Sequence, residues 1–341
     1  MPDHPPAELL PPDSRLTPYQ WLQRNLFNTW YNSLLTLTCA GTIAAILWFM
    51  FNWAITQAEW AVVQQNLPRF LVGRYPPALY WRLWLVLALV VGMGIWIASR
   101  KKAQTKLNLV NLALPALLFL VMLWLIGGGL GLTPVKTNLW NGLLLTLLLS
   151  AVSIVLAFPL GVLLALGRQS SLPLLRGFST TYIEILRGLP LIGVLFMAQV
   201  MLPLVLPADL RLDRLLRAIA GLVLFNAAYL AENVRGGLQS VPRGQIEAAQ
   251  ALGFNIPLTL LLIVLPQALR TVIPAIVGQF ISLIKDTSLL SLFALLELTG
   301  IARSILAQPQ FLGHYTEVYL FIGLIYWFFC FTLSHYSRRL E

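Results

Sequence analysis

The chain has 341 residues, of which 58% are hydrophobic and only 11% are charged. A water-soluble domain carries about 25% charged residues, so this composition excludes a globular soluble protein. The formal net charge of +10 is compatible with nucleic-acid binding. Basic cytoplasmic loops of a membrane protein explain it more simply, and we expect no nucleic acid among the partners.

The first half of the chain contains apolar segments long enough to cross a bilayer, which takes about 20 residues per helix. These are residues 34–55, 83–99 and 109–130. The second is followed by a basic cluster, Arg100, Lys101, Lys102 and Lys106, which the positive-inside rule places in the cytoplasm. Residues 1–33 are then a cytoplasmic, proline-rich lead-in. Residues 34–135 form three accessory spans with a periplasmic loop at about 56–80.

From residue 136 onward, charged and polar residues recur at the ends of the apolar segments. The spans expected there are 139–166, 186–206, 215–234, 265–284 and 318–334. The basic C-terminal sequence SHYSRRLE is also expected in the cytoplasm, so the number of crossings must be even. We therefore predict an all-α polytopic membrane protein with about eight transmembrane helices.

Residues 256–296 have the weakest hydropathy, because Arg270 and Lys285 divide them into apolar pieces of about 14 residues. We expect an interfacial segment, then a crossing that begins near Pro266. A bend at 285–288 and a short helix at 289–298 are expected to follow.

The polar stretch at 239–266, QSVPRGQIEAAQALGFNIPLTLLLIVLP, falls in the cytoplasm by this topology. Residues 247–252 favour a helix, which Ser240 can cap and whose first turn suits Pro242. Gly253 is well placed as the glycine that ends it. Two explanations stay open on these grounds: an ordinary loop helix, or a compact peg that offers Glu247 to a basic partner.

The spacing within this stretch resembles the EAA loop of ABC-importer permeases. That pattern is Glu-Ala-Ala, three residues, Gly, nine residues, Ile, one residue and Leu-Pro. Every spacing is met here, and the predicted coupling loop consists of Ser240, Pro242, Gly244, Glu247, Ala248, Ala249, Leu252, Gly253, Ile263, Leu265 and Pro266. In that family the loop is the coupling helix, which docks into a groove of the cytoplasmic ATPase subunit.

The flanking sequences resemble the polar amino-acid branch of these permeases. The similar stretches are 182–191, 228–245, 265–275, 285–289 and 297–298. Leu189 is a departure, since the branch usually has threonine there. The resemblance implies a five-helix, type I importer core at 136–341. The spans before it resemble the enlarged permeases of general L-amino-acid importers.

The resemblance also implies the partners. They are an ATPase subunit dimer, a second and related permease subunit, a periplasmic amino-acid-binding protein and an amino-acid substrate, in a lipid bilayer. No Walker sequence is present, so ATP and Mg²⁺ are expected on the ATPase. This chain is expected to bind no cofactor or metal and to catalyse no covalent step. The expected location is the bacterial inner membrane, with both termini cytoplasmic.

Charged residues at the span ends are candidates for a translocation pathway or gate. Glu232 and Arg235 lie one helical turn apart and can pair, either as a membrane-boundary pair or as a brace for the coupling loop. Glu184 and Arg187 repeat this spacing, before a bend that Gly188 and Pro190 permit. The remaining candidates are Lys285, Asp286, Thr287, Ser288 and Glu297.

The turn at 285–288 is either an interfacial turn, with Thr287 or Ser288 capping the next helix, or a gate. Glu297 lies in an apolar segment predicted to be helical, where contact with lipid is costly. It is therefore expected to face the pathway or a partner subunit.

The alternative is an ion-coupled secondary amino-acid transporter. That class predicts buried ionisable residues near the bilayer midplane and inverted repeats. Here the charges cluster at the span ends and no repeat is evident. An intramembrane enzyme would need a catalytic constellation, and none is visible in the sequence.

Overall fold

The computed structural model describes residues 17–102, 109–210 and 212–338. The chain separates into two units, Met1–Trp60 and Ala61–Glu341. The described residues are arranged in helices, with isolated β-bridges and no β-strand.

The first unit contains helices α1 (Pro18–Asn25) and α2 (Trp30–Thr56). A capping box starts α1, since the side chains of Thr17 and Gln20 each accept a hydrogen bond from the other's backbone N–H. Helix α2 is apolar on all sides, and none of its residues is buried. It contains the predicted first span and is long enough to cross a membrane.

The second unit begins with α3 (Ala61–Val72), α4 (Tyr80–Lys102) and α5 (Leu109–Gly127). Helix α3 lies within the predicted periplasmic loop. It buries Val62, Val63, Asn66 and Phe70, which recur at helical spacing on one face. That face packs against the core helices α6, α14 and α15, whose bounds follow.

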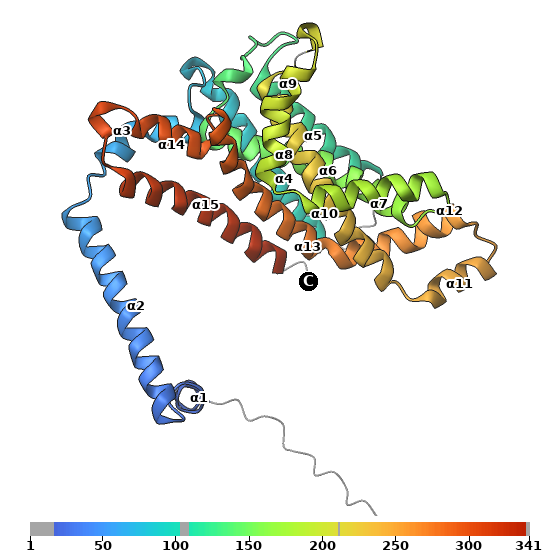
Figure 1. The fold of residues 1–341 in the computed structure, drawn as a ribbon, viewed down its shortest axis with the longest axis horizontal. Helices are drawn as coiled ribbons and strands as arrows, with labels where there is room; N and C mark the ends of the chain where they lie inside the picture. The colour runs from blue at the N-terminus through green and yellow to red at the C-terminus, as the bar shows by residue number, and fades with distance from the viewer. Residues whose placement is uncertain (1–16, 103–108, 211, 339–341) are drawn as a thin grey trace, which may run out of the picture. The chain divides into compact units, whose positions relative to one another are not determined.

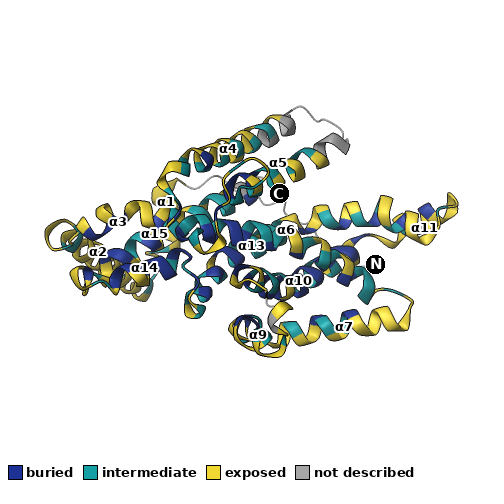
Figure 2. Ribbon diagram, turned by 90° about the horizontal axis from the view of Figure 1, so that it is seen from above, coloured by how far each residue is buried: buried dark blue, intermediate teal, exposed yellow. Residues whose placement is uncertain are grey.

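The core of the second unit contains α6 (Gly142–Arg168), α7 (Pro173–Gly188), α8 (Leu191–Phe196), α9 (Leu202–Val205), α10 (Arg214–Ser240), α11 (Arg243–Ala251), α12 (Ile256–Thr259), α13 (Leu265–Asp286), α14 (Leu298–Leu306) and α15 (Tyr315–Arg338). Helix α10 is central and packs against α6, α7 and α13 (Figure 1). Burial is concentrated along α6, α10 and α14, whereas α7 and α11 are largely exposed (Figure 2).

Within the described residues, six helices are long and apolar enough to cross a membrane, and a bent pair raises the count to seven. A shorter apolar helix covers Ala113–Gly127. Each of the eight predicted segments overlaps an apolar helix, but the count of eight is not confirmed. The all-α, multi-pass prediction is confirmed.

The predicted fifth span, 186–206, is wrong at its start. Helix α7 runs to Gly188, and the chain turns by 104° before it resumes at Leu191. Leu189 is extended, with φ −95° and ψ 142°, because a residue before proline is disfavoured in the helical region. The glycine and proline therefore produce the predicted bend, but the amphipathic arm α7 was not predicted.

The interfacial segment and the crossing expected to begin near Pro266 belong to one helical segment. This apolar segment, Ile256–Phe293, is continuous over 38 residues. A π-helical turn, Leu260–Val264, precedes this proline. Another π turn, Met197–Met201, precedes Pro203 at the same spacing. A wider turn accommodates the missing N–H and the bulk of the proline ring.

The predicted helix at 289–298 is not formed. A 3₁₀ helix covers Thr287–Phe293 and ends at Ala294, whose φ of 59° is left-handed. Helix α14 then starts at Leu298.

Candidate functional site

The predicted coupling loop forms a short helix, α11, between α10 and α12. Pro242 is its N-cap residue and makes no side-chain cap. The predicted cap by Ser240 is therefore wrong. Ser240 ends α10, and its Oγ donates to the carbonyl of Gly237 at 2.8 Å.

Gly253 ends α11 as predicted, in the left-handed conformation with φ +83°. Its N–H donates to the carbonyl of Gln250 at 2.9 Å, and the N–H of Phe254 donates to Ala249 at 3.1 Å. These two bonds define a Schellman motif, which gives the helix a fixed end.

Helix α11 packs on α12 and the π turn through one face and leaves the rest of its surface exposed. Ala249 is its buried residue, at 2% exposure, while Gly244, Glu247 and Ala248 are exposed. Just beyond it, Leu252 and Ile256 are 78% and 75% exposed. Exposed apolar side chains on a protruding element are typical of a surface that a partner covers.

The remaining motif residues connect α11 to the long helical segment that follows it. Ile263 lies in the π turn at Leu260–Val264, and Leu265 and Pro266 begin α13. The whole motif therefore occupies α11 and the first turns of one continuous rod.

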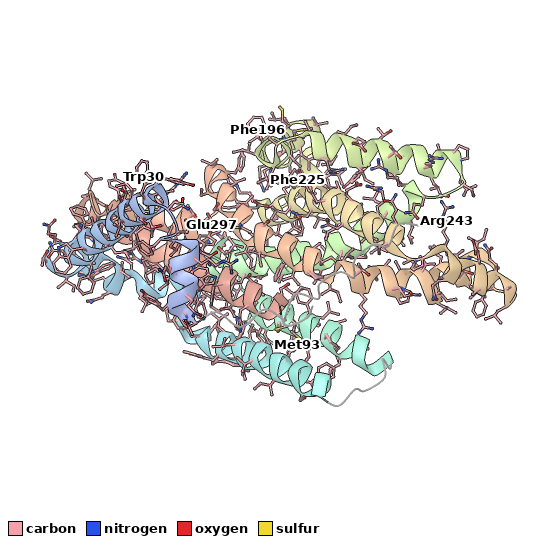
Figure 3. All side chains as sticks on the ribbon, turned by 90° about the horizontal axis from the view of Figure 1, so that it is seen from below. Trp30, Met93, Phe196, Phe225, Arg243 and Glu297 are labelled. Atoms are coloured by element: carbon pink, nitrogen blue, oxygen red, sulfur yellow. The ribbon has the colours of Figure 1, made fainter. Side chains whose placement is uncertain are left out.

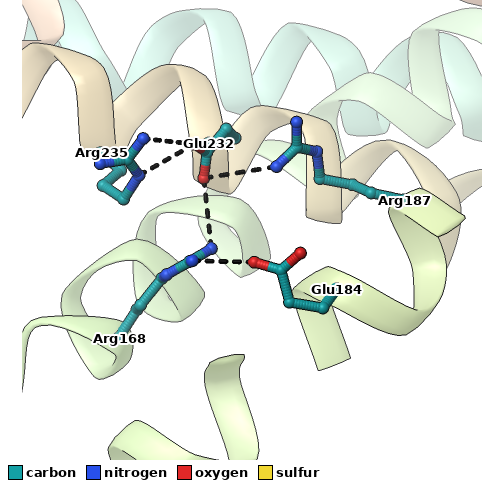
Figure 4. A network of polar contacts seen from close by, with 5 residues as sticks. All are labelled: Arg168, Glu184, Arg187, Glu232 and Arg235. Atoms are coloured by element: carbon teal, nitrogen blue, oxygen red, sulfur yellow. Dashed lines mark hydrogen bonds and ion pairs between the residues drawn. The ribbon is translucent and has the colours of Figure 1, made fainter. Parts of the chain in front are cut away.

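Five charged side chains meet where α6 ends beside α7 and α10 (Figure 4). Glu232 accepts hydrogen bonds from Arg235 Nε at 3.0 Å and Arg168 Nη1 at 3.3 Å. Arg187 lies 3.7 Å from the same carboxylate, and Arg168 binds Glu184 at 2.8 Å. The cluster joins three helices that are distant in sequence.

The structure confirms the predicted Glu232–Arg235 pair but corrects the second one. Glu184 and Arg187 are drawn to Arg168 and Glu232 on neighbouring helices. Arg168 was missed as a site residue. Its position two residues after the predicted span 139–166, beside other charged span ends, was the available signal.

Glu297 lies far from Arg243, the first residue of α11 (Figure 3). The other candidates are at the end of α13 and the start of the 3₁₀ helix that follows it. Lys285 is exposed near the end of α13. Thr287 Oγ1 donates to the carbonyl of Ile284 at 2.7 Å, so it does not cap the next helix. The carbonyl of Ser288 accepts from Ser291 Oγ at 2.8 Å.

Glu297 does not lie within a helix, and it is fully buried inside the chain. It is the N-cap of α14, and its carboxylate accepts from the backbone N–H groups of Thr299 and Gly300, both at 2.8 Å. The hydroxyl of Tyr326 donates to it at 3.2 Å. Burial raises the pKa of Glu297 to about 7, although these hydrogen bonds oppose the shift.

Two polar contacts between helical segments, one between amides and one from an arginine, were also missed. Gln279 Nε2 on α13 donates to Asn226 Oδ1 on α10 at 2.7 Å, and Asn226 is fully buried. Arg217 Nη1 donates to the carbonyl of Gln199 in the π turn at 2.7 Å. A search for charges passes over the amide pair, whereas a search for single amides within apolar spans would find it.

The structure thus combines an exposed short helix, a long apolar helical segment and a charged cluster that joins neighbouring helices. Comparisons with known proteins identify the family. Residues 157–341 match the family described as "Binding-protein-dependent transport system inner membrane component". The chain belongs to this family.

Two relatives match nearly the whole chain. The inner membrane amino-acid ABC transporter permease protein YhdY of Escherichia coli K12 is 40% identical, over 99% of this chain and 95% of its own length. The glutamate/glutamine/aspartate/asparagine transport system permease protein BztC of Rhodobacter capsulatus is 33% identical, over 97% and 94%. The accessory helices are thus within the matched length of both relatives.

Shorter proteins match the core. The probable glutamine ABC transporter permease protein GlnP of Bacillus subtilis is 39% identical, over 60% of this chain and 92% of its own. A chain in a crystal structure of an amino acid ABC transporter with histidines has a TM-score of 0.53 and 25% identity. The match covers 70% of this chain and 99% of that one.

As a family member, the chain is a multi-pass inner-membrane transport subunit of an ABC importer and not an enzyme. The family implies an ATPase partner and a binding protein. These similarities support the ABC-importer prediction and give no support to an ion-coupled transporter.

Proposed function

We propose that this permease translocates polar L-amino acids into the cytoplasm by alternating access. Support for the substrate class comes from the relatives, which are named for amino-acid transport and in one case for glutamate, glutamine, aspartate and asparagine. The observation that carries the coupling mechanism is the exposed, glycine-terminated α11, connected directly to a 38-residue apolar rod.

In this mechanism α11 docks into the partner ATPase, through Glu247 and the small side chains around it. ATP and Mg²⁺ bind that partner, and closure of the ATPase dimer displaces α11. The rod formed by α12 and α13 carries the displacement across the membrane. Pumping requires the substrate to bind the two conformations with different affinity.

The charged cluster has a supporting role in this proposal. Arg168, Glu184, Arg187, Glu232 and Arg235 fix the inner ends of α6, α7 and α10, beside the bend at Gly188–Pro190. The cluster then braces the helices against which the rod moves. Lys285, Asp286, Thr287 and Ser288 form the outer gate, and Glu297 supports it by capping α14.

We further propose that α11 and both termini are cytoplasmic, which places α3 and α14 at the periplasmic face. Residues 34–135 are the accessory segment and 136–341 the transport core. The second permease subunit is a related but different chain, so that the importer contains a heterodimer.

Reconstitution tests the function. The purified complex with the ATPase, second permease and binding protein is placed in liposomes, and uptake of labelled amino acids is measured with a panel of unlabelled competitors. Polar amino acids are expected to compete, and uptake is expected to require internal ATP and to survive an ionophore. A complex with a hydrolysis-deficient ATPase is the control. Uptake that continues without ATP and collapses with the ion gradient would contradict the proposal.

A further inference from the structure

Helices α3 and α14 are short amphipathic helices that pack against each other at the end of the second unit opposite α11 (Figures 1 and 2). Helix α3 belongs to the segment before the core, whereas α14 lies between α13 and α15. Both turn their apolar faces inward: Phe70 is fully buried in α3, as is Leu298 in α14. Their outward faces, together with the turn at 73–76 that follows α3, form what we call the α3–α14 surface.

Close contacts with α6 and α15 fix the position of α3 beneath this surface. The ring of Phe70 packs edge-on against Phe321, with 5.1 Å between centroids. A Cβ on Gly142 would lie 2.5 Å from the carbonyl oxygen of Phe70, and one on Gly73 would lie 2.1 Å from Cβ of Asn141. The two glycines, both with positive φ, therefore let the end of α3 approach the start of α6 closely.

Hydrogen bonds connect the start of α6 to the start of α14 as well. The N–H of Gly142 donates to the carbonyl of Leu296 at 2.8 Å, and the N–H of Leu298 donates to the buried Thr146 Oγ1 at 3.0 Å. The α3–α14 surface is thus preorganised, which lowers the entropic cost of binding a partner.

The α3–α14 surface is basic. Arg69, Arg74 and Arg303 are exposed, and residues 61–76 and 298–316 contain no aspartate or glutamate. Arg69 donates to the neutral amide of Asn66 at 3.1 Å, and Arg74 to that of Asn141 at 3.3 Å. These contacts orient the guanidinium groups without neutralising them.

Two acidic groups beside α14 are buried, whereas Glu59, two residues before α3 in the chain, is exposed. Glu297 is fully buried beneath α14 and attracts Arg303 from the inside. Glu317, at the start of α15, is 7% exposed and lies 3.9 Å from His314. In the proposed topology this is the periplasmic side, where short loops are usually poor in lysine and arginine. A binding role would account for the exposed arginines on this side.

We propose that the α3–α14 surface binds an acidic face of the soluble binding protein, so that the accessory segment supplies half of the docking site. This rests on the proposed import function and names the surface and its chemistry. A soluble protein fits better than a lipid surface, because a helix lying in the bilayer interface turns its apolar face to the acyl chains. Here those faces are buried in the protein, and Leu67, at 41% exposure, adds an apolar contact beside the arginines.

The test uses the complete complex in nanodiscs and measures ATP hydrolysis as the binding protein that stimulates the wild type is titrated. The variant combines Arg69→Gln, Arg74→Gln and Arg303→Gln. We expect its half-saturating binding-protein concentration to rise about tenfold, with a weaker dependence on salt, because steering by exposed charges is lost. Basal hydrolysis and melting temperature are expected to stay near wild type.

Two matched variants separate charge from packing. Replacing the three arginines with lysine keeps the charge and is expected to keep most of the stimulation. Leu71→Ala removes an exposed apolar side chain from the same helix and is expected to change the half-saturating concentration less than twofold.

Three outcomes would overturn the proposal. The glutamine variant can give an unchanged titration curve while the wild type responds normally. That result excludes the docking surface but leaves the proposed import function standing. A defect that appears in nanodiscs with anionic lipid and vanishes in neutral lipid assigns the arginines to lipid headgroups. A wild-type complex that shows no ATP-dependent uptake of amino acids with any binding protein overturns the proposed function as well.

Discussion

Glu232 is the residue on which the charged cluster depends, because three arginines converge on its one carboxylate. Its side chain is 23% exposed, whereas that of Glu184 is 56% exposed and contacts Arg168 alone within the cluster. Removing the better-buried partner leaves more uncompensated charge.

We therefore predict that Glu232→Gln lowers the free energy of unfolding by about 1–3 kcal/mol, between the values for exposed and buried pairs. Glu184→Gln is the matched control and is expected to cost less than about 1 kcal/mol. Thermal melting of the purified complex, at low and at high salt, measures both. Equal losses for the two variants would show that Glu232 does not hold the cluster together.

Glu297 makes stability depend on pH. Burial raises its pKa from 4.5 to about 7, so the folded protein takes up this proton more readily than the unfolded chain does. The favourable contribution is complete below pH 4.5. It is lost as the pH rises through about 7 and does not change further above that.

We predict that wild type loses on the order of 3 kcal/mol relative to Glu297→Gln between pH 4.5 and pH 7.5, since one pKa unit corresponds to about 1.4 kcal/mol. Melting curves of the two proteins across this range provide the measurement. Parallel pH profiles would place the titration of Glu297 outside this window.

The sequence predicts the contacts within one helix better than those between helices. Spacing alone gave the Glu232–Arg235 pair, which is present. It also suggested a Glu184–Arg187 pair, but both side chains find partners on other helices. Helical periodicity determines which residues of one helix are neighbours. The partner across an interface depends on packing that no local pattern describes.

At the level of elements, α11 depends on its terminal glycine. Gly253 has a positive φ, and no atom lies within 4 Å of where its Cβ would be. Aspartate and asparagine tolerate this left-handed conformation better than most residues and have the same shape. They therefore separate the effect of a charge from that of strain.

We predict that Gly253→Asp lowers ATP-driven uptake at least about tenfold, because docking would bury an unpaired charge. Gly253→Asn is expected to retain most of the activity. Membrane insertion should be normal for both, as judged by the yield of assembled complex. If the aspartate variant still transports and stimulates the ATPase normally, α11 does not dock as proposed.

The close contact between α3 and α6 leads to a second prediction, which concerns Gly142 at the start of α6. Gly142→Ala places a Cβ 2.5 Å from the carbonyl oxygen of Phe70, in a backbone with φ +65°. We expect a loss of about 2 kcal/mol or more from the combined strain and displacement. In Gly177→Ala, on α7, the new Cβ has nothing within 4 Å, and a gain of about 0.5–1 kcal/mol is expected. Melting temperatures of both variants measure the difference.

Two features of the helices were not predicted, and they share a physical cause. A break or kink was expected at Pro266, because a proline within a helix normally interrupts it. The π turn before Pro266 keeps the helix continuous. Similarly, α7 is amphipathic and lies against the core, so it carries too little apolar sequence to be recognised as part of a span. Both features depend on backbone geometry and packing rather than on composition.

For the whole molecule, the sequence predicted the all-α membrane fold and the ABC-importer class. It did so because long apolar segments and the EAA spacing are strong local signals. The junction of α3 with the core was not predicted, since α3 and α14 are more than 200 residues apart along the chain.

The proposed orientation can be tested in cells. In a background with Cys39 and Cys330 replaced by alanine, Gln64→Cys on α3 and Gln245→Cys on α11 introduce thiols at exposed positions. A membrane-impermeant maleimide is expected to label position 64 in intact spheroplasts, and position 245 after permeabilisation only. The reverse pattern would invert the topology and move the α3–α14 surface to the cytoplasm.

The continuity of the segment Ile256–Phe293 has a mechanical consequence. Its 38 residues extend over roughly 55–60 Å, at the rises of α and 3₁₀ helices, about twice the thickness of the hydrocarbon core. In the proposed mechanism this segment is a lever with one end attached to α11. A tilt of roughly 5° over such a length displaces the far end by about 5 Å. A small displacement of α11 on one side of the membrane is then converted into a movement of atomic dimensions on the other.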